Sequence, residues 1–581
     1  MGMIKFLRNF SASLTALFVF FVFLPFFMLS FLSAVFMAAN TSELSPGKIS
    51  GGGVFVLDLS FPIGERVEDE NSLAAAIEGL SSTSVYNAVQ IIRDASCDRR
   101  VKAILIRGSV DESGAGLAAI AELREAVCEA CESLPVYAYL ENPSLRDYFI
   151  ATAASEIILN PFSEFEFKGI STSAPYFGNA FKKYGIDAQI VRAGKHKSFG
   201  DIFTKSKMDG ADKEILKSVV GGIWECIISK ISESRNLTPE FLREFADSKA
   251  ICSAEEAKKL KLVDKLMYDD ELIDMLAQKY GSEGDSFKQV FVDSFPAASR
   301  AGNIAIVYMS GDIVEADISP SVISSERYVG ILRKLRSDSS IKGVVLRIDS
   351  GGGSAYASEV IRREVELLAK EKPVVASFSS VAASGAYWIA TAADNIFLMP
   401  ETITGSIGVF SIAFSVEKFA GGYGVDFDGV KTSPFADIGT LTRPMGEREL
   451  ALTGKMVREV YDRFVDLVCK SRKISPAELA EIADGRIFDG ATAVRLNLAD
   501  GFGTLDEVVA ALMEKCECDG VKEYPKIDRF KEFMKSFSAA EPFAKSVPPK
   551  LKAYLDSIKS LSAYSDKRGI YARIPFDIAL K

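Results

Sequence analysis

A segment near residue 150 of the sequence recurs almost unchanged 239 residues later. IATAASEIILNP at 150–161 reappears as IATAADNIFLMP at 389–400. The similarity extends upstream, where VKAILIRG at 101–108 resembles IKGVVLRI at 341–348. Self-similarity at one fixed separation is typical of duplicated structural units. The chain is therefore expected to contain two similar domains in tandem.

Each copy alternates apolar, β-branched runs with helical patterns. A buried strand is followed by a turn, by a helix such as ASEVIRREVELLAKE at 357–371, and then by further short strands and helices. Near-continuous apolar strands separated by helices predict a mostly parallel sheet. The length of 581 residues also exceeds what one hydrophobic core usually organises. We expect two α/β domains, each a β/α spiral.

An apolar run near the N-terminus predicts a membrane anchor. Leu14 to Ala39 contains no charge, and about 20 such residues span a bilayer core. Lys5 and Arg8 precede the run, so the positive-inside rule places the N-terminus in the cytoplasm. A cleaved signal peptide would have a shorter apolar region and an A-x-A-like site. We expect a single-pass helix that contacts lipid through 14–39, with the catalytic part on the extracytoplasmic (periplasmic) side of the inner membrane.

These features divide the chain into four predicted segments. They are a cytoplasmic tip with the anchor (1–45), the N-terminal repeat (46–295), the C-terminal repeat (296–520) and a C-terminal extension (521–581). The extension carries apolar and basic residues at loosely helical spacing and is interpreted as lying outside the repeat.

The two copies differ at polar, glycine-rich positions. The C-terminal copy reads RIDSGGGSAYASE where the N-terminal copy reads RGSVDESGAGLAA, without consecutive glycines. Consecutive glycines let a backbone approach a ligand and turn its N–H groups toward it. Ser384, at a strand-to-helix junction, aligns with Leu145, and TGSIGVF at 404–410 aligns with FEFKGIS. The C-terminal copy thus keeps a candidate nucleophile, a glycine loop and a polar GS pair that the N-terminal copy lacks.

The N-terminal copy carries a candidate base instead. Its segment AGKHKSFGDIF places Lys197 opposite Ser433 of the other copy, and His196 is the single histidine of the chain. Burial favours a neutral lysine amine, which can take the proton of a serine hydroxyl. A Lys-His-Lys triplet alone is typical of a solvated basic loop, but the complementary losses favour a pair of Ser384 and Lys197. A pair of Ser384 and His196 remains an alternative.

Taken together, these motifs resemble a known family. The tandem arrangement, DSGGGSAYASE, SSVAASGAYWIATAAD, TITGSIGVF and the KHKS segment are similar to the signal peptide peptidases of the long, two-repeat SppA type, over nearly the whole chain beyond the anchor. The resemblance implies two tandem crotonase/Clp-like domains and a membrane-anchored serine endopeptidase. Its implied substrates are cleaved signal peptides and similar apolar peptides, hydrolysed through an acyl-enzyme, and its implied assembly is a homotetramer.

The resemblance also implies roles for individual residues. Ser384 would be the nucleophile, Lys197 the general base and Ser406 the group that orients the lysine. The amides of Gly385 and Gly352 would hold the oxyanion. The family usually reads S-P-G-G in the glycine loop, where this chain has S-G-G-G at 350–353. Glycine in place of proline makes the loop less rigid but removes no backbone donor.

Composition argues against other partners. The net charge of -10 gives no electrostatic case for nucleic acid. The close cysteine pairs, at 128/131 and 516/518, lack further ligands at zinc spacing, so no metal and no cofactor is predicted. Two other functions remain in competition. An acyl-CoA enzyme of the same fold would need neither a serine nucleophile nor an anchor, and a catalytically inactive membrane scaffold would not need the complete set of candidate residues.

Overall fold

The computed structural model describes residues 52–60, 63–65, 83–110, 115–290, 302–525 and 569–574. The predicted anchor at 14–39 and most of the predicted C-terminal extension lie outside these ranges. Within them, no helix combines the length and the apolar character needed to cross a bilayer. The described residues of both repeats belong to one compact unit.

The N-terminal repeat is built on a six-stranded parallel sheet. Its strand order is β10-β6-β5-β4-β1-β13. The strands are β1 (Gly53–Asp58), β4 (Val101–Arg107), β5 (Val136–Leu140), β6 (Glu156–Leu159), β10 (Lys265–Leu266) and β13 (Gln289–Val290). The helices are α3 (Val85–Cys97), α4 (Leu117–Cys131), α5 (Leu145–Ala151), α6 (Gly178–Tyr184), α7 (Asp201–Thr204), α8 (Gly210–Arg235), α9 (Pro239–Ser248), α10 (Ala254–Lys259) and α11 (Asp269–Tyr280). Three short pairs complete it: β2 (Ile63–Gly64) with β3 (Thr83–Ser84), β7 (Glu164–Glu166) with β9 (Ile251–Ser253), and β11 (Ser282–Glu283) with β12 (Ser286–Phe287).

The C-terminal repeat repeats this plan in an eight-stranded sheet. Its main order is β23-β21-β19-β17-β14-β25, with β20 beside β19 and β24 beside β20. The strands are β14 (Ile304–Ser310), β17 (Gly343–Ser350), β19 (Val374–Ala383), β20 (Asn395–Leu398), β21 (Ile403–Gly405), β23 (Ile487–Asp489), β24 (Gly501–Phe502) and β25 (Val521–Tyr524). All pairs are parallel except β21 with β23. The predicted tandem α/β organisation is therefore confirmed.

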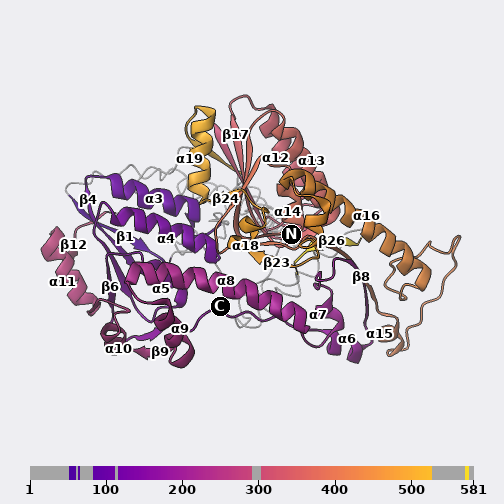
Figure 1. Ribbon diagram of the computed structural model, residues 1–581, viewed down its shortest axis with the longest axis horizontal. Coiled ribbons are helices and arrows are strands. Elements are labelled where there is room, and N and C mark those ends of the chain that lie inside the picture. The colour runs from indigo at the N-terminus through magenta and orange to yellow at the C-terminus, as the bar shows by residue number, and fades with distance from the viewer. Residues whose placement is uncertain are drawn as a thin grey trace, which may run out of the picture. The chain divides into compact units, whose positions relative to one another are not determined.

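Helices cover both faces of the C-terminal sheet (Figure 1). They are α12 (Ser325–Ser337), α13 (Ala355–Ala369), α14 (Gly385–Ala390), α15 (Glu417–Gly421), α16 (Glu447–Arg472), α17 (Pro476–Ala480), α18 (Gly490–Arg495) and α19 (Leu505–Cys516). Side chains alternate across β17, so Val344 and Leu346 join the core with α12 and α13, whereas Val345 packs with α19. The two repeats also begin a corresponding helix in the same way. The side chains of Ser84 and Ser324 cap α3 and α12 by accepting a hydrogen bond from the backbone amide three residues later.

The two repeats share one further sheet, in the order β16-β15-β18-β26-β22-β8. Its strands are β8 (Asp187–Ala193), β15 (Ile313–Val314), β16 (Ile323–Ser324), β18 (Gly352–Ser354), β22 (Val409–Ser415) and β26 (Ile570–Arg573). Strand β8 comes from the N-terminal repeat and pairs antiparallel with β22 along its whole length. Strand β26 comes from the predicted C-terminal extension. This sheet brings three distant parts of the chain together.

The C-terminal sheet continues past the predicted boundary at residue 520. Strand β25 pairs with β14 just as β13 pairs with β1 in the other repeat. The repeated unit therefore includes residues up to Tyr524, because the first strand of each sheet takes its outer partner from the end of its own repeat. The other predicted domain limits stay predictions.

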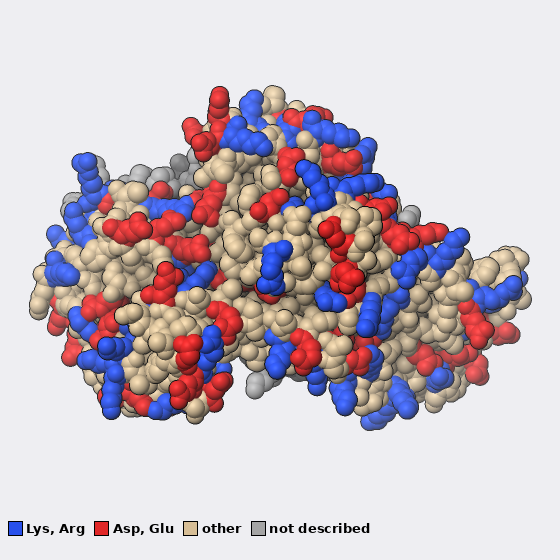
Figure 2. Space-filling view, in the orientation of Figure 1, with Lys and Arg blue, Asp and Glu red and all other residues tan. Residues whose placement is uncertain are grey.

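Most charged side chains on the face shown in Figure 2 lie at the surface, where basic and acidic groups are interspersed. One ion cluster is buried instead, and it joins the two repeats. Its centre is Arg347 of β17, which is only 1% exposed. It lies 2.7 Å from Glu122 of α4 and 2.8 Å from Glu65, both from the N-terminal repeat. Burial raises the pKa of Glu122 to about 7, although Arg347 lowers it.

Replacing Arg347 by leucine should destabilise the protein by about 3–5 kcal/mol, because two buried carboxylates lose their counter-charge. Arg333 is a matched control, since it pairs with Glu364 while its side chain is 61% exposed, and its replacement should cost no more than about 1 kcal/mol. The folded-state pKa of Glu122 lies above its unfolded value, so stability falls as pH rises through about 7. Without Arg347, an ionised Glu122 has no counter-charge, so the stability lost in the Arg347→Leu variant should be larger at high pH than at low pH. Urea unfolding measures the free energy of unfolding of both variants. Equal losses of stability in the Arg347 and Arg333 variants would contradict the prediction.

Candidate active site

Ser384 lies at a sharp turn between strand β19, which ends at Ala383, and helix α14, which begins at Gly385. Its backbone has φ 59° and ψ −112°, which is unusual for a residue with a side chain. The Ser384 amide donates to the carbonyl of Gly405 at 2.9 Å, and its own carbonyl accepts from Trp388 at 2.8 Å. A strained turn of this kind presents a serine hydroxyl at the end of a sheet strand.

Lys197 of the N-terminal repeat meets this serine. Its Nζ lies 2.5 Å from Ser384 Oγ, 2.8 Å from the carbonyl oxygen of Ser406 and 2.9 Å from Ser406 Oγ. All three side chains are fully buried. Residues that are 187 positions apart in sequence thus form one hydrogen-bonded cluster, with Ser406 holding the amine from a second side.

The path of the chain explains how the lysine arrives. Strand β8 pairs with β22 up to Ala193, which lies opposite Val409. After this pairing the chain carries Lys197 between two glycines of the C-terminal repeat. A Cβ atom on Gly485 would lie 2.6 Å from the backbone nitrogen of Lys197, and a Cβ atom on Gly408 would lie 3.2 Å from Lys197 Cδ. The lysine therefore enters through a gap that leaves little or no room for side chains at these two positions.

The surroundings of Lys197 favour a neutral amine. Burial lowers its pKa well below the ordinary lysine value. Its partners at Ser384 and Ser406 are neutral oxygens, which stabilise an ammonium less than a carboxylate would. The amine is therefore suited to accept a proton from the serine hydroxyl that contacts it.

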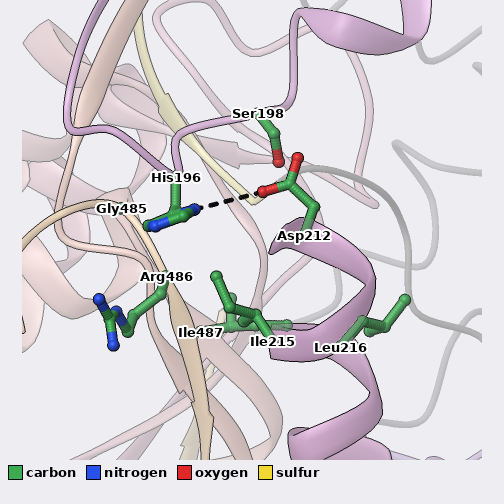
Figure 3. A pocket seen from close by; sticks show the side chains of 8 residues that line it. All are labelled: His196, Ser198, Asp212, Ile215, Leu216, Gly485, Arg486 and Ile487. Atoms are coloured by element: carbon green, nitrogen blue, oxygen red, sulfur yellow. Dashed lines mark ion pairs between the residues drawn. The ribbon is translucent and has the colours of Figure 1, made fainter. Parts of the chain in front are cut away.

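The two neighbours of Lys197 in the Lys-His-Lys triplet lie elsewhere. Lys195 is exposed to solvent. The His196 imidazole lies in a small pocket, with Nδ1 at 3.5 Å from Asp212 and Nε2 at 3.7 Å from Asp484. Figure 3 shows this pocket, with the histidine facing Asp212. The structure thus brings Lys197 to the nucleophile and places the imidazole of His196 between two carboxylates.

The glycine loop lies directly beside the nucleophile. Gly352 has φ 100°, and its amide donates to Ser350 Oγ at 3.1 Å, so this predicted oxyanion donor already has a partner. The next amide lies near the nucleophile turn, because a Cβ atom on Gly385 would be 3.2 Å from the nitrogen of Gly353. The role of Gly352 as an oxyanion donor therefore stays a prediction, and the neighbouring Gly353 is a second candidate.

The corresponding region of the N-terminal repeat holds a structural cluster instead. Leu145, the counterpart of Ser384, begins α5. Asp147, which is 1% exposed, accepts from the amide of Val110 at 2.7 Å, from Ser109 Oγ at 2.7 Å and from the Ser144 amide at 2.8 Å. Ser144 Oγ donates to the same carboxylate at 2.7 Å, so a buried carboxylate satisfied by four donors stabilises this loop. It supplies no nucleophile at the position of Leu145.

A strained serine at a strand end, a buried lysine on its hydroxyl and a nearby glycine loop together define the site of a serine hydrolase. The model of peptidase family S49 matches residues 130–283 and 366–519, once in each repeat and together over more than half of the chain. The chain therefore belongs to peptidase family S49, and the predicted two-repeat membership is confirmed. It is a serine peptidase of this family.

Curated relatives agree with this assignment. Protease 4 of Salmonella typhi is 29% identical over 557 residues, which cover 90% of each chain. Protease 4 of Haemophilus influenzae is 30% identical over 73% of this chain and 72% of its own. The chloroplastic serine protease SPPA of Arabidopsis thaliana is 28% identical over 81% and 70%. Among solved structures, ClpP1 from Listeria monocytogenes covers 34% of this chain, with 17% identity and a TM-score of 0.23.

Proposed function

We propose that this peptidase cleaves peptide bonds with Ser384 as nucleophile and neutral Lys197 as general base. The observation that carries the proposal is the buried contact of 2.5 Å between Lys197 Nζ and Ser384 Oγ. The two contacts from Ser406 support it, because they fix the direction of the amine. His196, the alternative base, contacts two carboxylates instead.

The reaction follows from this geometry. Lys197 takes the hydroxyl proton as Ser384 Oγ attacks the substrate carbonyl carbon, and the resulting ammonium gives that proton to the leaving amine. The developing oxyanion accepts from the amides of Gly385 and Gly353, and one such donor contributes about 2.7–4 kcal/mol of transition-state stabilisation. Water then hydrolyses the acyl-enzyme, with Lys197 again as the base.

The proposed location rests on the sequence, and the proposed substrates rest on the family resemblance. The charge-free run at 14–39, with Lys5 and Arg8 before it, supports a single-pass anchor with the catalytic part outside the cytoplasm. Cleaved signal peptides and similar apolar peptides are the proposed substrate class, which the family resemblance implies. The homotetramer implied by the family resemblance is part of the same proposal.

The proposed base predicts a specific pH dependence. The rate constant kcat/KM should rise about tenfold per pH unit and then level off at the pKa of Lys197, because only the neutral amine acts as base. Burial lowers this pKa, so the plateau should begin well below the reference value of about 10.4. Hydrolysis of a fluorogenic apolar peptide between about pH 6 and pH 10 measures the profile. The His196→Ala variant should give the same curve, whereas a loss of activity in that variant comparable to that of Lys197→Ala would assign the base to His196.

A serine-reactive probe separates the peptidase from an inactive scaffold of the same fold. Full-length protein in membranes should be labelled at Ser384, and the Ser384→Ala variant should not be labelled. Labelling requires an activated hydroxyl, so the Lys197→Ala variant should also lose most of it. Wild-type protein that neither reacts with the probe nor cleaves peptides would favour the scaffold.

A further inference from the structure

Strand β19 contains a bulge just before it reaches the nucleophile. Its pairing with β17 is regular up to the pair of Ile348 and Phe378, and it resumes with the pair of Ser350 and Ala382. Between these two pairs β17 has one residue, whereas β19 has three, at positions 379–381. Extra residues in one strand bend it and increase its twist, and bulges are frequent beside active sites, where they re-aim a side chain.

The bulge is also the point where β19 changes its neighbour. The three residue pairs before it join β19 to β20, and the three pairs after it join β19 to β21. Strand β21 ends at Gly405, whose carbonyl accepts from the amide of Ser384. The next residue, Ser406, contacts the amine of Lys197. The shape of the bulge therefore affects where both groups of the proposed Ser–Lys pair lie.

Asp349 of β17 holds the bulge from the opposite strand. Its Oδ1 accepts from the amide of Val381 at 2.9 Å, and its carboxylate also accepts from the amide of Ser380. Amides inside a bulge lose their partners in the strand ladder, and buried amides need a replacement acceptor. A carboxylate is a strong acceptor for this purpose. Asp349 thus fastens the bulged segment to β17, close to the nucleophile.

The negative charge of Asp349 is poorly compensated. Burial and the nearby Glu65 raise the pKa of Asp349 to about 7, although the amide of Val381 and Arg347 lower it. Arg347 is already paired with Glu65 and Glu122. A neutral side chain of the same shape, with an acceptor oxygen at the same place, should therefore hold the bulge as well as the carboxylate does.

The described part of the N-terminal copy does not have this arrangement. In the aligned segments the counterpart of Asp349 is Ser109, whose hydroxyl donates to Asp147. Strand β5, the counterpart of β19, pairs with β4 without a shift of register and ends at Leu140. The bulge and its acceptor thus occur in the copy that carries Ser384.

We propose that Asp349 is a positioning residue for the peptidase reaction, because it fixes the bulge of β19 and thereby aims Ser384 at Lys197. This inference rests on the proposed function, since the aim of the serine matters only if the serine is the nucleophile. A displacement of about 1 Å in a reacting group can cost about 10²-fold in rate. Removing the acceptor, or changing its reach, should therefore lower kcat and leave KM nearly unchanged.

Three substitutions of Asp349 in the full-length protein separate its shape from its charge. Asp349→Asn keeps an acceptor oxygen at the same reach and should keep kcat for a fluorogenic peptide within about threefold of wild type. Asp349→Glu keeps the charge but is longer by one methylene, and Asp349→Ala has no acceptor, so both should lose about 10²-fold in kcat. KM should change by less than about threefold in all three variants. An active Glu variant together with an inactive Asn variant would show that the charge acts, and would overturn the positioning role.

Asp394 provides a matched control at the other end of the same strand. Its Oδ2 accepts from the amide of Val374, the first residue of β19, at 2.9 Å. Asp394→Ala should lower the free energy of unfolding but leave kcat unchanged, because this contact lies before the bulge. Equal losses of kcat in Asp394→Ala and Asp349→Ala would mean that any loosening of β19 slows the enzyme, and would overturn a specific role for Asp349. The Asn and Glu variants decide the question even if Asp349→Ala does not fold.

The rate at which a serine-reactive probe labels Ser384 gives a second readout, which needs no peptide substrate. Labelling should slow in Asp349→Ala and Asp349→Glu about as much as kcat falls, and it should stay near the wild-type rate in Asp349→Asn. Wild-type protein that is labelled and cleaves peptides, with an Asp349→Ala variant that matches it, overturns this inference alone. Wild-type protein that is neither labelled nor active overturns the proposed function, and this inference with it.

Discussion

Replacing Lys197 by methionine should reduce peptide hydrolysis by about 10³- to 10⁶-fold, the range seen when one member of a catalytic unit is removed. Methionine keeps much of the volume of the buried side chain but cannot accept a proton. Ser384→Ala should have a similar effect, and the double variant should be no worse than either single one, because the two groups act in one step. Initial rates with a fluorogenic peptide measure all three.

Stability measurements give this experiment its control. Lys197 is fully buried without a carboxylate among its hydrogen-bond partners, so an apolar side chain there should leave the free energy of unfolding unchanged or increase it. Lys195→Met, two residues away on the surface, should change neither rate nor stability. A Lys197→Met variant that keeps more than about a tenth of the wild-type rate would contradict its role as base.

Much of the fold could be predicted from the sequence because local signals were repeated. Similar apolar runs occur in both copies, ILIR at 104–107 and VVLR at 344–347, and they form the central strands β4 and β17 of two mostly parallel sheets. The turn that carries Ser384 was also predicted, since a serine followed by glycine between a strand and a small-residue helix allows a tight turn. These features depend on residues that are close in sequence.

The remaining features depend on tertiary contacts. The pairing of β8 with β22, which carries Lys197 to Ser384, crosses from one repeat to the other. Only the complementary losses between the copies pointed to it. Nothing in the repeat indicated that β26 would pair with the glycine loop, because this segment has no counterpart in the N-terminal copy. The cluster around Arg347 was also missed, since an arginine in an apolar run gives no sign of its partners.

The dependence of the site on both repeats leads to the second large effect. Residues 46–295 and residues 296–581, expressed separately, should each hydrolyse peptides at least about 10³-fold more slowly than the whole chain. Each half holds only one of the two groups, Lys197 or Ser384. Co-expression of the halves should restore activity, because β8 can pair with β22 and the buried charges of Arg347 and Glu122 meet again.

The decisive comparison places the lysine substitution in one half of the split protein. Co-expressed halves in which residues 46–295 carry Lys197→Met should assemble to the same yield but remain inactive, whereas Lys195→Met in that half should have no effect. Co-purification of the two halves reports assembly separately from activity. If residues 296–581 alone hydrolyse peptides at the full rate, the base lies within the C-terminal repeat. In that case the contact between Lys197 and Ser384 has no catalytic role, and the shared site is disproved.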